Sequence, residues 1–220
     1  MTKPDLYEIS EGLRVSGIDL PSFGAHVPRF TVELWRLLTN GRPISPEQVE
    51  KTLSSLGISR EVLIQLQAGL EYDGQGNIVG AVGLSLNPAS ANRLQINGHT
   101  LYTWCAWDAL FIPGLIGRTA DVESRSPAGG ESVHLTVAPD TVSELIPEQA
   151  VVSMLAPTEP FDHDVIMSFC HFVHFFTSRG DAEPWLAEHP GTFLLSVKEA
   201  FELGRLTNRA TFGETNEAAA

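Results

Sequence analysis

The chain has 220 residues, 43% of them apolar, enough to bury a core as one domain or as one domain with a small appendage. It carries 14 Lys and Arg against 27 Asp and Glu, for a formal net charge of −13. Nucleic acids and anionic membranes are bound by clustered positive charge. This balance therefore argues against both partners and indicates a soluble protein.

The sequence also argues against a membrane span and a secretory signal. It contains no run of about 18 consecutive apolar residues, which is the length that a transmembrane helix needs. Charges, Gly and Pro interrupt the first 25 residues, so they lack the apolar segment of a signal peptide. We therefore expect a cytoplasmic protein, in which Cys105 and Cys170 are free thiols.

The N-terminal third is predicted to be helical. Residues 1–24 are expected to form a loose arm. Apolar residues at helical spacing predict a first helix over 26–40, a capping-box pattern at 45–48 begins a second, and a third spans 59–70. A glycine-rich turn and a strand follow, so residues 25–80 resemble a winged helix-turn-helix subdomain.

This resemblance does not predict DNA binding. The third helix would be the recognition helix, and it carries only Arg60 as a cation. A DNA-binding surface needs a basic stripe or patch, which the acidic N-terminal part does not supply.

Residues 81–212 are predicted to form a catalytic α+β core, with an antiparallel sheet and flanking helices, followed by a frayed tail at 213–220. Strands are expected over 78–86, 93–98, 99–104, 119–126, 131–139, 150–157 and 192–197, and helices over 140–149, 183–189 and 198–210. Asn97-Gly98 predicts a hairpin turn. The apolar run at 164–177 suits either a central strand or a buried helix.

The apolar stretch 102–118 contains one cysteine, Cys105, and a carboxyl three residues later, Asp108. If this stretch is helical, the two side chains lie on one face within reach of each other. A carboxyl among apolar neighbours loses its hydration, which raises its pKa and suits a proton carrier near neutral pH. A structural alternative stays open, in which Cys105 is a small buried apolar residue and Asp108 a helix cap.

The second thiol, Cys170, lies in an equally apolar run. Two thiolates can hold a soft cation in two-coordinate fashion. A Cys2His2 zinc site with His171 and His174 is a rival, although neither helical nor strand spacing points these side chains the same way. A cysteine-protease dyad leaves the other thiol and the aspartate without a role. The sequence contains no nucleotide-binding glycine motif and no HExxH motif.

Four segments, LYTWCAWDALFIPGLIGRTADV, SVHLTV, SFCHFVHFF and SVKEAFELG, resemble the bacterial organomercurial lyase (alkylmercury lyase) family. The resemblance extends from about Trp35 to Asn208. It implies that Cys105 and Cys170 are the catalytic cysteines, that Asp108 is the catalytic aspartate, and that these three residues contact the mercury of substrate and product. The implied fold is a winged-helix-like N-terminal part packed on an antiparallel sheet core.

The resemblance further implies cleavage of a carbon–mercury bond by protonolysis, giving a hydrocarbon and Hg(II). No cofactor is expected, but exogenous thiols are needed to release Hg(II), with mercuric reductase as a partner that accepts the ion. Two alternatives from other classes remain. One is a noncatalytic thiol-based mercury-binding protein, and the other is a metal-responsive winged-helix regulator.

Overall fold

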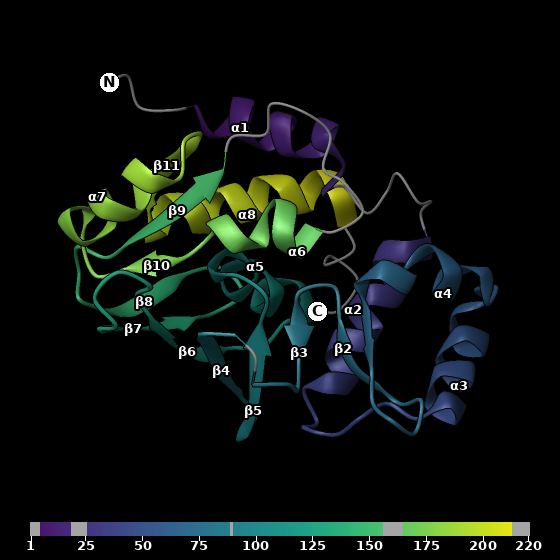
Figure 1. Ribbon diagram of the computed structural model, residues 1–220. Coiled ribbons are helices and arrows are strands. Elements are labelled where there is room, and N and C mark those ends of the chain that lie inside the picture. The colour runs from purple at the N-terminus through teal and green to yellow at the C-terminus, as the bar shows by residue number, and fades with distance from the viewer. Residues whose placement is uncertain (1–4, 19–25, 89, 156–164, 213–220) are drawn as a thin grey trace.

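The computed structural model describes residues 5–18, 26–88, 90–155 and 165–212. The fold is mixed α+β, with one eight-stranded and one three-stranded sheet, both antiparallel, and with helices packed around them (Figure 1). The predicted α+β class, with an antiparallel sheet and flanking helices, is therefore confirmed. Within these residues, no helix has both the length and the apolar character that crossing a membrane requires.

The larger sheet has the strand order β1-β2-β3-β5-β4-β6-β7-β8. Its strands are β1 (Leu70–Tyr72), β2 (Ile78–Ala81), β3 (Leu84–Ser85), β4 (Asn92–Ile96), β5 (His99–Thr103), β6 (Ala120–Arg125), β7 (Ser132–Val137) and β8 (Val142–Ile146). The predicted β4–β5 hairpin is confirmed. Asn97 and Gly98 connect its strands with φ values of 53° and 79°, a left-handed pair that fits a tight hairpin turn.

The smaller sheet has the order β10-β9-β11. Its strands are β9 (Val151–Leu155), β10 (Phe175–Phe176) and β11 (Thr192–Ser196). Because β9 is the central strand, it contacts the segment around Cys170 on one side and the approach to the last helix on the other.

The α-helices are α1 (Leu6–Leu13), α2 (His26–Leu38), α3 (Pro46–Leu56), α4 (Glu61–Gln65), α5 (Ala106–Ile116), α6 (Val165–Ser168), α7 (Arg179–Glu188) and α8 (Val197–Phe212). Nine of the eleven residues of α5 are buried, because it packs between the larger sheet and α8. Figure 1 shows α1 on the other side of α8, and α2, α3 and α4 grouped beside β2.

The capping box predicted for the second helix is confirmed. The Ser45 N–H donates to Gln48 Oε1 at 3.0 Å, and the Gln48 N–H donates to Ser45 Oγ at 3.2 Å. These two bonds satisfy N–H groups that a helix start otherwise leaves without partners. Gly57 ends the helix in the left-handed conformation, with φ 66°.

Three details of the sequence prediction are wrong. Residues 140–149 were expected to be helical, but β8 pairs with β7 there, because the sheet edge offers backbone partners and Pro147 follows directly. The arm expected to be loose is helical over 6–18, since Leu13 finds a fully buried position and α1 packs on α8. The run at 164–177, in the part that the structure describes, is neither one strand nor one helix.

Candidate active site

Cys105 and Asp108 lie at the start of α5. Cys105 is the residue before the helix, in an extended conformation with φ −140°, and Asp108 is the third helical residue. The Cys105 N–H donates to Asp108 Oδ2 at 3.0 Å, and the Thr103 hydroxyl donates to the Cys105 carbonyl at 2.8 Å. The carboxyl thus caps the helix, as the structural alternative predicted, and it also lies beside the thiol, as the predicted pairing requires. Cys105 itself is extended and lies just outside the helix, so the two residues do not share a helix face as predicted.

Cys170 begins a short 3-10 turn, Cys170–Phe172, that packs on β9. Ser153 of β9 positions this turn, because its hydroxyl donates to the Phe172 carbonyl at 2.7 Å and accepts from the His174 N–H at 3.0 Å. The Ala106 N–H donates to the Val173 carbonyl at 3.1 Å, which ties the same segment to the first turn of α5. Backbone contacts therefore bring Cys170 next to Cys105 across a long stretch of sequence.

The structure brings the three predicted site residues together. One ligand atom each from Cys105, Asp108 and Cys170 lies within 4.8 Å of the other two, and all three residues are buried. Both cysteines are free thiols. Two thiol sulfurs and one carboxylate oxygen at this spacing can surround a soft cation such as Hg(II).

The two histidines lie outside this cluster. His171 is exposed, and His174 places Nε2 2.7 Å from the His171 carbonyl. Over the described ranges, the group of two cysteines and one aspartate is the one cluster of His, Cys, Asp or Glu compact enough for a metal ion. This geometry contradicts the Cys2His2 alternative.

The surroundings shift the pKa values of the acid and of one thiol. Burial raises the pKa of Asp108 to about 7, although its hydrogen bonds with Cys105 act in the opposite direction. Burial also raises the pKa of the Cys105 thiol well above its ordinary value, and the hydrogen bond with Cys170 and the charge of Asp108 add to this. Near neutral pH, Asp108 can therefore take up a proton or give one away, while Cys105 holds its proton.

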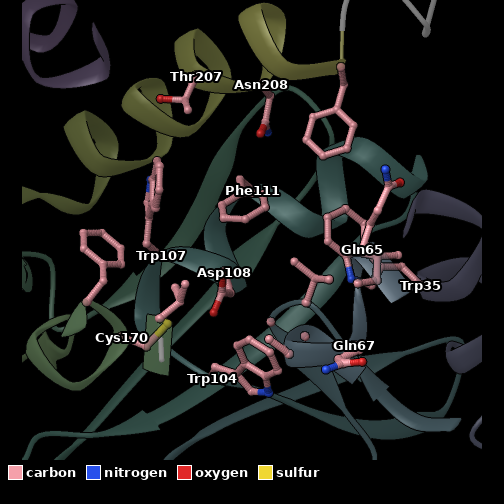
Figure 2. A pocket seen from close by; sticks show the side chains of 18 of the residues that line it. Trp35, Gln65, Gln67, Trp104, Trp107, Asp108, Phe111, Cys170, Thr207 and Asn208 are labelled. Carbon is pink, nitrogen blue, oxygen red and sulfur yellow. The ribbon is translucent and has the colours of Figure 1, made fainter. Parts of the chain in front are cut away.

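Asp108 and Cys170 face a pocket of about 520 Å³. Figure 2 shows them pointing into the same space, between the indoles of Trp104 and Trp107. Most of the remaining wall is apolar, and its other aromatic side chains are Trp35, Phe111, Phe169 and Phe212. Cys105 does not line this pocket but lies next to Asp108 and Cys170. The pocket can hold an apolar group against the carboxyl and one sulfur.

Gly83, which no motif in the sequence marks as part of the site, makes room for Asp108. Its φ is +94°, and a Cβ atom at this position would lie 2.8 Å from Asp108 Cγ. Its carbonyl also accepts a hydrogen bond from the Trp104 N–H at 3.0 Å. The signal in the sequence was a glycine within the strand pattern of 78–86, which often marks a close approach of another group.

A family model described as MerB, alkylmercury lyase, matches residues 84–208. An alkylmercury lyase of Pseudomonas putida is 42% identical over 84% of this chain and 87% of its own length. Those of Streptomyces lividans and Bacillus cereus are 38% and 42% identical, over 83% and 76% of this chain and 85% and 69% of their own lengths.

A crystal structure described as the mercury-bound form of MerB2 has a similar fold. Its TM-score is 0.68 at 24% sequence identity, with 94% of this chain and 98% of that chain covered. At this identity the likeness supports the arrangement of helices and sheets.

Proposed function

The chain belongs to the alkylmercury lyase family, and on this premise we propose that Cys105, Asp108 and Cys170 carry out its reaction, the cleavage of a carbon–mercury bond. The activity is that of an organomercurial lyase. The observation that carries the assignment of residues is the buried cluster of two thiols and one acid within 4.8 Å, at the wall of an apolar pocket.

In the proposed mechanism, the mercury of R–Hg–X first meets Cys170, because this cysteine lines the pocket and Cys105 does not. The Cys170 sulfur binds mercury in place of X, and the thiol proton leaves with X as HX. Thiolate is the ligand that soft Hg(II) prefers, so this exchange is favourable.

Asp108 then accepts the proton of the Cys105 thiol as the Cys105 sulfur binds the same mercury, because coordination to a metal makes a thiol more acidic. Donation from two sulfurs increases the electron density on the bound carbon. Asp108 delivers its proton to that carbon, the carbon–mercury bond breaks, and RH leaves while Hg(II) stays on the two sulfurs. A pKa of about 7 suits Asp108 to both roles, since neither protonation state is strongly favoured near neutral pH. The apolar pocket keeps water away from this exchange.

The product Hg(II) leaves by transfer to other thiols. Two thiolates bind Hg(II) tightly, so its release requires transfer to other thiols, either those of small molecules or those of mercuric reductase. No cofactor enters the scheme, and neither nucleic acid nor a membrane takes part. Free thiols at the site fit a reducing, cytoplasmic location.

The winged-helix-like character of residues 25–80 is also a proposal, supported by the succession of α2, α3 and α4 before β1 and β2.

The test is detection of methane or benzene in the headspace over purified protein with a methyl- or phenylmercury compound and excess thiol. We expect Asp108→Ala to bind Hg(II) as the parent does and to release no hydrocarbon, because the proton carrier is gone. Cys170→Ser should lose both turnover and tight binding. Asp121→Ala, the loss of an exposed acid on β6, is the matched control and should keep full turnover.

The noncatalytic alternative predicts a different result. A noncatalytic mercury-binding protein would bind Hg(II) and release no hydrocarbon even in the parent chain. Full hydrocarbon release by Asp108→Ala would refute the proton-carrier role, and undiminished turnover by Cys170→Ser would refute the two-thiol mechanism.

A further inference from the structure

Glu71 on β1 lies outside the catalytic cluster, yet it is hydrogen-bonded to the pocket wall. Its carboxylate accepts from Trp104 Nε1 at 2.6 Å, from Ser85 Oγ at 2.6 Å and from Asn87 Nδ2 at 2.8 Å. We propose that Glu71 is a positioning residue that holds the Trp104 indole as a fixed wall, and that this wall keeps small organic groups against Asp108. The proposal rests on the proposed function and adds a determinant of substrate size to it.

The strand register shows how Glu71 reaches this position. Glu71 of β1 pairs with Gly80 of β2, and Gly80 pairs with Ser85 of β3. The Glu71 side chain crosses the β2 backbone at the glycine, where a Cβ atom would lie 2.5 Å from Glu71 Cδ. Any other residue at position 80 would occupy the path of the carboxylate. Gly80 is thus part of the arrangement that brings Glu71 to Trp104.

Trp104 is the residue that Glu71 fixes. It directly precedes Cys105, and its indole lines the pocket. Figure 2 shows the ring beside Asp108 with its nitrogen edge turned away from the carboxyl. Nε1 is the single polar atom of an indole, and hydrogen bonds to carboxylates are strong and directional. The bond to Glu71 therefore sets the rotation of the ring and the shape of the wall it presents.

This wall matters more for a small organic group than for a large one. Proton transfer requires the carbon to lie within close reach of the Asp108 carboxyl, and a misplacement of about 1 Å can cost about a hundredfold in rate. A phenyl ring can touch several of the aromatic side chains around the pocket of about 520 Å³. A methyl group touches few, so its position depends on the wall nearest to Asp108.

The experiment compares kcat and KM for methylmercury and phenylmercury in Glu71→Ala and Gly80→Ala. Both variants release Trp104, the first by removing the carboxylate and the second by displacing it. We expect kcat for methylmercury to fall about tenfold and kcat for phenylmercury less than threefold, with unchanged Hg(II) stoichiometry. Glu71→Gln should recover most of the loss, since its amide oxygen can accept from Trp104. Glu123→Ala, on β6 and outside this pocket, is the control.

A double-mutant cycle tests whether Glu71 acts through Trp104. Trp104→Phe keeps an apolar ring but removes the donor, so adding Glu71→Ala in that background should cause no further loss. An equal loss for both substrates, no loss, or a further loss in the Trp104→Phe background would overturn the proposal. If Glu71→Ala fails to fold, Gly80→Ala still tests the proposal. Its added methyl group has to displace only the flexible Glu71 carboxylate, so this variant should fold. Absence of hydrocarbon from the parent chain would instead refute the proposed function.

Discussion

Asp108 is a carboxyl placed where ionisation is costly. It is 8% exposed, and its neighbours in the pocket are mainly apolar. The hydrogen bonds from the Cys105 thiol and from the Cys105 N–H partly compensate for the lost hydration, and they limit the rise of the pKa to about 7. The same environment that suits the group to proton transfer therefore reduces the stability of the fold once the group ionises.

This cost predicts a pH-dependent effect of Asp108→Asn. The folded pKa, about 7, lies above the ordinary value of 3.8. The stability that Asp108 contributes is therefore fully present below about pH 4 and is lost as the pH rises to about 7. The amide has no such dependence. Relative to the parent, the free energy of unfolding of Asp108→Asn should increase by about 2 to 4 kcal/mol between pH 4 and pH 8, measured by urea denaturation.

Asp121→Asn, an exposed position on β6, is the control and should show no comparable change. A difference between Asp108→Asn and the parent that is the same at both pH values would contradict the raised pKa.

At the residue scale, the sequence was sufficient to place Cys105 and Asp108 together, because a residue just before a helix and the third helical residue meet in a capping box. The roles of these two residues and of Cys170 came from the family resemblance and stay predictions. Gly83 and Glu71 were not foreseen. Both act through strands that meet the catalytic segment only in the folded chain, and spacing along one sequence does not show such contacts.

At the element scale, the segment around Cys170 departs most from its sequence pattern. The run at 164–177 is apolar enough for one long element, but its described part forms α6, a 3-10 turn and the two-residue strand β10. The hydrogen bonds of Ser153 and Ala106 to this segment explain the breaks, since they occupy backbone groups that a continuous helix would use itself. Strands with clear alternation and a turn signal, such as β4 and β5, were predicted correctly because the residues that determine them are adjacent in the sequence.

Ser153→Ala tests this account of the Cys170 segment. Ser153 is fully buried, and the substitution leaves the Phe172 carbonyl and the His174 N–H without their partner. We expect a loss of about 1 to 3 kcal/mol in the free energy of unfolding. Turnover should also fall, because Cys170 is no longer held against Cys105.

Ser124→Ala is the matched control for Ser153→Ala. Ser124 is 1% exposed on β6, and its hydroxyl donates to Asn92 Oδ1 at 2.7 Å, away from the pocket. This variant should lose comparable stability and keep its turnover. Equal turnover in both variants would show that Ser153 does not position Cys170.

At the scale of the whole molecule, the N-terminal helices and the sheet share one core. A single cluster of buried side chains extends from Leu13 and the residues of α2 and α3 through the sheet to α5 and α8. Trp35 of α2 connects the parts most directly. Its Nε1 donates to the Ala81 carbonyl at 2.8 Å, and its ring packs edge-on against Phe111 at a centroid distance of 6.3 Å. The boundary near residue 80 that the sequence predicts stays a prediction, but no gap in packing marks it among these side chains.

The shared core predicts one cooperative unfolding transition that Trp35→Ala shifts as a whole. Trp35 is 1% exposed, so its removal leaves a cavity and removes the hydrogen bond to the Ala81 carbonyl, for a loss of about 3 to 5 kcal/mol. Urea denaturation followed by intrinsic fluorescence and far-UV circular dichroism should give coincident transitions in parent and variant. Ile146→Ala, at a side chain that is 64% exposed, should change stability by less than about 0.5 kcal/mol. Separate transitions for helical and sheet signals would instead show that the N-terminal helices fold as a unit of their own.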